Sequence, residues 1–135
     1  MVDCENEVFS TVATALRAAF TGIFVSGEAV AAPSTFPAVT LVEDDNSTYQ
    51  RSLDSSGREN HAQIMYTVNA YSNKSSGKKA ETKSIMAVID AQMFNMGFLR
   101  VGSGPQEMPN ANASIYRMVA RYRAVISKDK TIYRK

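Results

Sequence analysis

The chain has 135 residues, a net charge of +2 and an apolar fraction of 44%. This length suits one compact domain, in which about two-thirds of the surface of the unfolded chain becomes buried. No apolar run approaches the roughly 20 residues needed to cross a bilayer, and no export signal is recognised. The single cysteine, Cys4, excludes an internal disulfide and fits a reducing cytoplasm.

The first predicted elements are a helix and two short strands. Apolar residues recur at helical spacing from Val8 to Phe20, with Asp3 placed to cap this helix and Gly22 to end it. Two β-prone runs follow at 23–26 and 38–43, separated by turn-forming residues. The polar segment 43–60 is too long for a tight hairpin, so we expect a projecting loop or β-arm there.

The second half of the chain predicts a helix between strands. Strict alternation indicates a strand over 61–72, and an apolar stripe indicates a helix over 78–96 that ends at Gly97. A short strand over 98–102, a loop over 103–113, a long strand over 115–126 and a β-prone tail over 131–135 follow. The order α-β-β-β-α-β-β predicts an α+β fold in one domain, residues 1–135, with a mainly antiparallel sheet and two helices packed on one face.

The strand predicted over 115–126 has two unlike faces. One face carries Tyr116, Met118, Ala120, Tyr122, Ala124 and Ile126, and the other carries Arg117, Arg121 and Arg123 beside Ile115, Val119 and Val125. Such a strand covers a core with its apolar face and presents the other to water or a polyanion. We therefore expect the function on the arginine face, with a solvated face that binds nothing as the alternative.

Charge is distributed unevenly along the chain. Residues 114–135 hold seven Lys or Arg and one acid, a net charge of +6, whereas residues 1–113 hold eight bases and twelve acids, a net charge of −4. This asymmetry indicates either a polyanion partner or self-association of unlike patches. Glu43, Asp44 and Asp45 are the candidate acidic patch. Adjacent residues of a strand point in alternating directions, so we expect no metal site there.

Catalytic chemistry is not indicated. His61 is the only histidine and Cys4 the only thiol, so the residues of one chain do not indicate a histidine-based metal cluster, a Ser-His-Asp triad or a Cys-His pair. We expect no catalytic residue, no bound metal and no cofactor.

Four segments carry a family resemblance: VFSTVATALR (8–17), FPAVTLVE (36–43), YTVNAYSNK (66–74) followed by GKKAE (77–81), and IYRMVARYRAV (115–125). Together they resemble small structural proteins encoded in tailed-bacteriophage morphogenesis clusters, and most closely the tail terminator, or tail completion, family. The resemblance covers most of the chain and includes the order of the elements. The family has no invariant catalytic motif.

The resemblance implies a non-enzymatic virion protein. Copies of the chain would form a ring, typically a hexamer, that caps the tail tube and joins it to the head-side connector or stopper protein. The protein would assemble in the host cytoplasm and remain in the tail or neck of the virion. Segments 43–60 and 103–113 would be the arms that contact neighbours, and Glu43, Asp44 and Asp45 an acidic patch between subunits.

The residues leave open the role of the arginine face and two alternative functions. In a closed ring, Arg117, Arg121 and Arg123 either face the channel, where they attract DNA phosphates without reading bases, or lie in a joint between subunits. Their charge favours the channel, whereas the apolar residues beside them favour the joint. A head-completion or neck protein of the same particle is an alternative function. A small nucleic-acid-binding module is another, although the arginine face lacks the interleaved aromatic residues of a single-strand platform.

Overall fold

The computed structural model describes residues 3–28, 33, 35–48, 61–108, 114–127 and 132–133. Its elements are α1 (Glu5–Ala19), β1 (Phe24–Ser26), β2 (Ala38–Thr48), β3 (His61–Ser72), α2 (Lys78–Met96), β4 (Leu99–Met108), β5 (Tyr116–Ser127) and β6 (Ile132–Tyr133). The predicted α+β fold and element order are confirmed, and β6 lies within the tail that was predicted to be β-prone.

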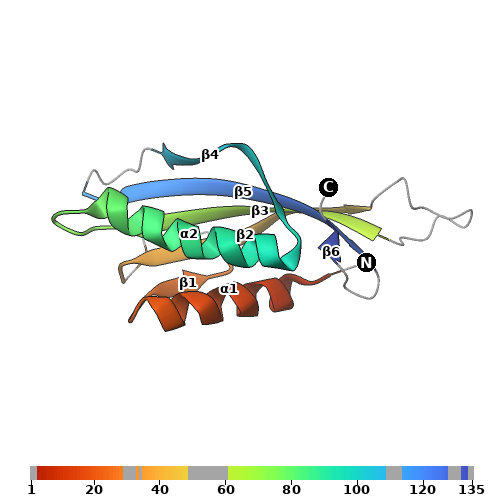
Figure 1. Cartoon of the computed structure of the whole chain (residues 1–135), viewed down its shortest axis with the longest axis horizontal. Helices are drawn as coiled ribbons and strands as arrows, with labels where there is room; N and C mark the ends of the chain where they lie inside the picture. Colours follow the sequence, from red (N-terminus) through yellow and green to blue (C-terminus); the bar gives the residue numbers. More distant parts are fainter. Residues whose placement is uncertain are drawn as a thin grey trace, which may run out of the picture.

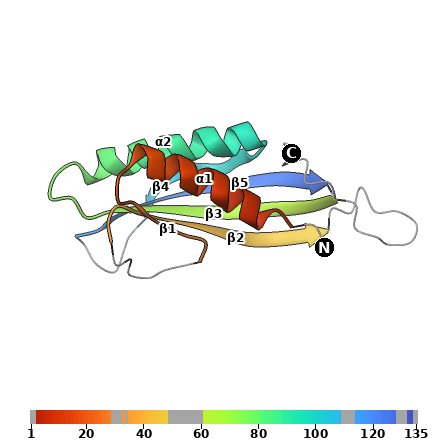
Figure 2. The same ribbon diagram turned by 90° about the horizontal axis from the view of Figure 1, so that it is seen from below.

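The strands form one sheet in the order β1-β2-β3-β5-β4, with β6 paired to the end of β5. Only the β1–β2 pair is parallel, and every other pair is antiparallel. Both helices lie on one side of this sheet, as Figure 1 and Figure 2 show. α1 lies beside α2, and α2 covers β3 and β5. The second side of the sheet carries no helix among the described residues.

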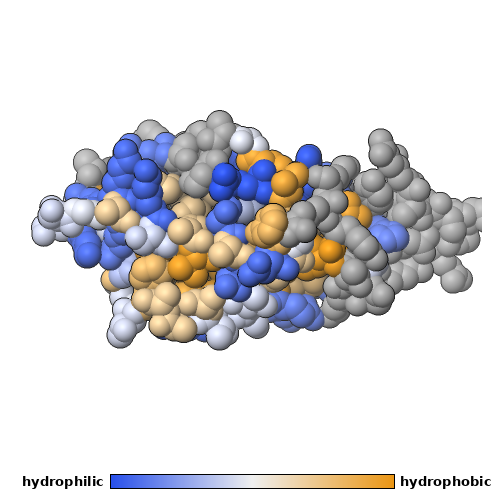
Figure 3. Space-filling view, viewed as in Figure 1, coloured by the Kyte–Doolittle hydropathy of each residue, from blue (hydrophilic) through white to orange (hydrophobic). Residues whose placement is uncertain are grey.

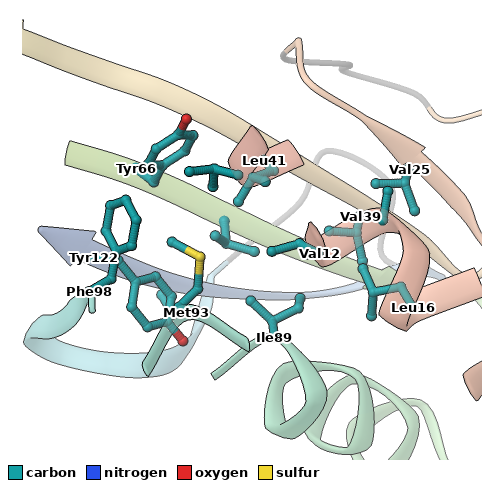
Figure 4. Packing of buried hydrophobic residues seen from close by; sticks show 14 of the residues in the cluster. Val12, Leu16, Val25, Val39, Leu41, Tyr66, Ile89, Met93, Phe98 and Tyr122 are labelled. Carbon is teal, nitrogen blue, oxygen red and sulfur yellow. The ribbon is translucent and has the colours of Figure 1, made fainter. Parts of the chain in front are cut away.

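The core lies between the helices and the sheet. α1 buries Val8, Val12, Ala13 and Leu16, and α2 buries Thr82, Ile85, Met86, Ile89 and Met93, which recur at the helical spacing seen in the sequence. These side chains meet the inward faces of β2, β3 and β5, and Figure 4 shows Tyr66, Phe98 and Tyr122 grouped at one end of the cluster. Each fully buried leucine or isoleucine contributes about 1.5–3 kcal/mol to this packing.

The predicted end of α2 agrees with the structure, whereas the predicted cap of α1 does not. α2 ends at Gly97 as expected, in the left-handed conformation with a φ of 110°. At the start of α1, however, the N-cap position is Cys4, and Asp3 precedes it. The Asp3 carboxylate accepts a hydrogen bond from the backbone N–H of Glu5 at 3.0 Å. Asp3 therefore supports the first turn of α1 from one residue further out than we expected.

One predicted boundary is wrong, and the structure narrows a second expectation. Residues 103–108 were expected in a loop, but β4 continues to Met108, with a register shift between Val101 and Gln106. The glycines and proline of this segment indicate a loop, yet the long partner strand β5 supplies hydrogen bonds beyond them. By contrast, β2 extends past residue 43 to Thr48, so the first part of segment 43–60 is a strand, in agreement with the β-arm that was one of the two expectations for it. Residues 49–60 and 109–113 lie outside the described residues.

Candidate functional site

The three arginines lie on the side of the sheet opposite the helices. In the β3–β5 pair, Arg117 faces Tyr71, Arg121 faces Thr67 and Arg123 faces Met65. The alternate residues of β5, from Met118 to Ile126, are buried in the core on the helix side. The sequence prediction that all three arginines share one face and the core residues share the other agrees with this register.

The arginine face is less open than we expected. Arg121 is exposed, but Arg117 and Arg123 are half-buried, and Val119 and Val125 are less than a tenth exposed. One reason is a row of hydrogen bonds across three strands. Arg117 Nε donates to Asn69 Oδ1 at 2.9 Å, and Asn69 Nδ2 donates to Thr40 Oγ1 at 3.2 Å. The stem of Arg117 therefore lies across the sheet and not away from it.

The three acids of β2 do not share a face. Glu43 pairs with Tyr66, whose side chain lies in the core, so Glu43 points to the helix side. Asp45 pairs with Met65 on the arginine face, and Thr67 of that face donates a hydrogen bond from its hydroxyl to the Asp44 carboxylate. A register shift between Glu43 and Asp45 explains why two adjacent acids share one face. Strict alternation, on which the sequence prediction rested, does not hold here.

Asp44 and Asp45 therefore lie on the same face as the arginines, but on a different strand. Asp44 accepts a hydrogen bond from Thr67, whose partner on β5 is Arg121, and Asp45 pairs with Met65, whose partner on β5 is Arg123. With β3 between them, the acidic and basic strands are about 10 Å apart, twice the spacing of neighbouring strands. Among the described residues, no ion pair joins these acids to these arginines. We call this surface the two-signed face.

Glu43 occupies a different environment on the helix side. Burial, followed by the nearby charges of Glu5, Asp3 and Asp45, raises the pKa of Glu43 to about 7. Its Oε1 atom is buried and has no hydrogen-bond partner within the described part of the chain, and the same holds for the hydroxyl of Tyr66 opposite. Burial and the charge of Glu43 also raise the pKa of the Tyr66 hydroxyl. This region is an acidic, partly desolvated site beneath the first turn of α1.

A second polar cluster, which sequence reasoning missed, lies where α2 meets β4. Arg100 Nη1 contacts Asp90 Oδ1 at 3.0 Å, and the hydroxyl of Tyr122 donates to the same oxygen at 2.9 Å. Burial and this hydrogen bond raise the pKa of Tyr122. Asp90 directly follows the buried Ile89, at the edge of the apolar stripe of α2, and its side chain is 40% exposed. An acidic residue next to an apolar stripe was the signal available in the sequence, because a carboxylate near apolar side chains is stabilised by a charged or hydrogen-bonding partner.

The two remaining candidate residues, Cys4 and His61, lie on different elements. Cys4 is buried at the start of α1, and His61 is the first residue of β3. In the described ranges, no three His, Cys, Asp or Glu side chains are grouped so that they could hold a metal ion. No described helix is long and apolar enough to span a membrane. In comparisons with known proteins, no family model and no curated protein matches this chain.

Proposed function

We propose that this protein is a structural component of a tailed-phage particle, which assembles into a ring that caps the tail tube and joins it to the head-side connector or stopper protein. The resemblance of four segments to tail terminator proteins supports this proposal. The α+β fold, with both helices on one side of the sheet, agrees with the architecture that the resemblance implies. The proposed ring size, six, comes from the resemblance alone.

The two-signed face is the observation that carries the proposal. Its acids on β2 and arginines on β5 are separated by β3, and no ion pair joins them among the described residues. Charges of both signs on one surface are complementary to the same surface of another copy. The acidic strand of one subunit can contact the basic strand of the next, and this contact can repeat from subunit to subunit. The repeated contact closes a ring when the rotation between neighbouring subunits divides a full turn evenly. Asp44 and Asp45 are thus the proposed intersubunit acids, whereas Glu43 faces the helices.

Complementary charge reversal tests this assembly. One variant carries Asp44→Lys and Asp45→Lys, so both strands are basic, and the other carries Arg121→Glu and Arg123→Glu, so both are acidic. Neither variant should assemble alone because every contact joins like charges. Mixed together, they should assemble again, since each acidic strand then meets a basic one. Native mass spectrometry at low salt measures the number of chains in each species.

The wild type and a variant reversed elsewhere serve as controls. Lys79→Glu changes an exposed charge at the start of α2, on the helix side, and should leave assembly unchanged. Wild-type protein that keeps the mass of one chain at all concentrations contradicts self-assembly. A species of only two chains contradicts the ring and indicates that two sheets stack face to face about a two-fold axis.

DNA contact by Arg117, Arg121 and Arg123 is the alternative for the same surface. The hydrogen bond of Arg117 to Asn69 favours the joint, because a DNA-facing arginine must extend toward phosphates. Val119 and Val125 are buried within the chain itself, so they favour neither reading. Fluorescence anisotropy with labelled duplex DNA distinguishes the two. A DNA-facing surface predicts binding that weakens with salt and with Arg121→Ser, whereas a joint predicts no binding by the assembled ring.

A neck or head-completion protein would form rings as well, and the position of the ring in a particle reconstruction separates it from a tail terminator.

A further inference from the structure

The groove between α2 and β4 has two hollows, one on each side of the Asp90–Arg100 ion pair. One hollow, of about 220 Å³, is lined by Asp90, Phe94, Phe98, Leu99, Arg100 and Tyr122. The other, of about 370 Å³, is lined by Lys83, Met86, Ala87, Asp90, Arg100 and Met118. Both hollows lie on the helix side of the sheet, opposite the two-signed face. This surface is therefore separate from the proposed joint between subunits.

The groove gathers exposed apolar side chains at one place. Phe94 is 57% exposed and Leu99 is 38% exposed, and both line the smaller hollow. Met86 and Met118, which are almost fully buried, form the floor of the larger hollow. Methionine side chains adapt their shape to different apolar partners. Figure 3 shows hydrophobic residues beside hydrophilic ones over α2 and the neighbouring part of β4.

The described residues that line these hollows carry a net charge of +1. Lys83 and Arg100 contribute two cations to the lining, against the single carboxylate of Asp90. The bond to Asp90 uses Nη1 of Arg100, and a guanidinium group has five N–H donors in all. The Arg100 side chain is 43% exposed, so its remaining donors are accessible to a second carboxylate. The ion pair thus holds Arg100 in place between the hollows while leaving it able to bind an acid.

We infer that the groove between α2 and β4 binds a short segment of a partner protein in which large apolar side chains stand next to a carboxylate. Apolar side chains of the segment enter the hollows, and its carboxylate contacts Arg100 or Lys83. Two hollows on either side of one cation fit neighbouring side chains of a single chain segment. A second copy of this protein docking groove to groove is disfavoured, because it would bring Lys83 and Arg100 against the same two cations.

Methionine methyl NMR on the full chain tests the inference. The probes are short synthetic peptides with Leu, Met or Phe next to Asp or Glu in a Ser-Gly background. Matched control peptides carry Lys in place of the acid or Ser in place of the apolar residue. Acidic apolar peptides should shift the methyl signals of Met86 and Met118 and leave Met65, on the two-signed face, unchanged. Both kinds of control peptide should bind at least about tenfold more weakly.

Two pairs of variants assign the binding to the groove. Arg100→Ser should weaken binding about tenfold, whereas Lys79→Ser, on the exposed first turn of α2, should not. Ala87→Leu fills the larger hollow and should weaken binding by at least a similar factor, whereas Ala80→Leu, two turns away on the same helix, should not. Unfolding curves for all four variants show that each remains folded.

Three outcomes would overturn the inference. The first is that no acidic apolar peptide shifts the Met86 and Met118 methyl signals. The second is that lysine peptides bind as tightly as acidic ones, which removes the role of Arg100 and Lys83. The third is that the two signals shift with protein concentration alone, which means that a second copy occupies the groove. None of these outcomes bears on ring assembly, which depends on the opposite side of the sheet.

Discussion

Tyr66 and Tyr122 face one another on neighbouring strands, yet only one of the two hydroxyl groups has a visible hydrogen bond. Tyr122 donates to Asp90 at 2.9 Å, whereas the buried hydroxyl of Tyr66 has no hydrogen-bond partner among the described residues. Both rings belong to the core, and Tyr66 also packs edge-on against Phe98 with ring centroids 5.6 Å apart. Both rings thus pack in the core, but only the hydroxyl of Tyr122 gains a hydrogen bond there.

Replacing each tyrosine with phenylalanine should separate these consequences. Tyr122→Phe removes a hydrogen bond to a carboxylate and should lower the free energy of unfolding by about 1.5–3 kcal/mol. Tyr66→Phe removes a buried polar group that gains no hydrogen bond and should leave the free energy of unfolding unchanged or raise it. Urea denaturation measures both. Equal losses for the two variants would show that the Tyr66 hydroxyl does have a partner.

Glu43 should make stability depend on pH. The folded chain keeps the Glu43 proton up to pH about 7, whereas the ordinary pKa of the group is 4.5. The folded state therefore binds more protons between these two values, and its stability falls as pH rises through that range. The contribution is fully present below pH 4.5 and is lost as pH rises through about 7.

The variant Glu43→Gln should remove this part of the pH dependence. Thermal unfolding from pH 5 to pH 8 measures it, as the difference in stability between wild type and variant at each pH. We expect Glu43→Gln to stabilise the chain relative to wild type at the upper end of the range. Glu28→Gln, at an exposed position, is the control and should follow the wild-type curve. A constant difference between Glu43→Gln and wild type across the range would contradict the raised pKa.

At the scale of the elements, the short strand β6 lies against the C-terminal end of α2. Gly97 has a φ of 110°, and a Cβ atom there would lie 2.9 Å from the carbonyl oxygen of Ile132. Gly22 also has a positive φ, 76°, but a Cβ atom there would meet nothing within 4 Å. Both glycines therefore have a positive φ, but the φ of Gly97 lies further from the left-handed region of L residues, and β6 approaches only Gly97.

Alanine substitution at these two glycines should measure how closely β6 is packed. Gly22→Ala carries the left-handed penalty alone, about 1–2 kcal/mol. Gly97→Ala carries at least this penalty, because its φ is less favourable for an L residue, and it also pushes against the backbone of β6, so it should cost clearly more. Chemical denaturation gives the two values, and amide hydrogen exchange at Ile132 should become faster only in Gly97→Ala. Similar costs for both variants would mean that β6 yields easily.

The elements also show what the sequence can predict. β3 and α2 were predicted with the observed boundaries, because strict alternation and a helical stripe depend on residue pattern alone. The end of β4 was not, since Gly102 indicates a turn while pairing with β5 decides the outcome. The β-bulge near Asp44 was also unpredictable, because it arises from pairing with β3. It placed Asp44 and Asp45 together and left Glu43 apart, which no period-two pattern anticipates.

At the scale of the whole molecule, the two proposed interaction surfaces lie on opposite sides of the sheet. The two-signed face lies on the side without helices, and the α2–β4 groove lies on the helix side. A chain arranged in this way can contact a neighbouring copy and bind a partner segment at the same time. A structural protein at a joint between two assemblies needs both kinds of contact.

Serine substitutions at Arg117 and Arg121 should distinguish a role in folding stability from a role in assembly on the two-signed face. Arg117 binds Asn69, which is 7% exposed, so Arg117→Ser leaves a buried amide without this bond and should cost about 1–3 kcal/mol of stability. Arg121 is exposed, so Arg121→Ser should leave the free energy of unfolding within about 0.5 kcal/mol of wild type. In a joint between subunits, Arg121→Ser should nevertheless weaken assembly, and most strongly at low salt, because it removes a charge that faces Asp44 and Asp45 of the neighbour. Urea denaturation and native mass spectrometry across a salt series measure the two effects on the same samples. Intact assembly of Arg121→Ser at every salt concentration would remove Arg121 from the joint and leave its charge to solvent or DNA.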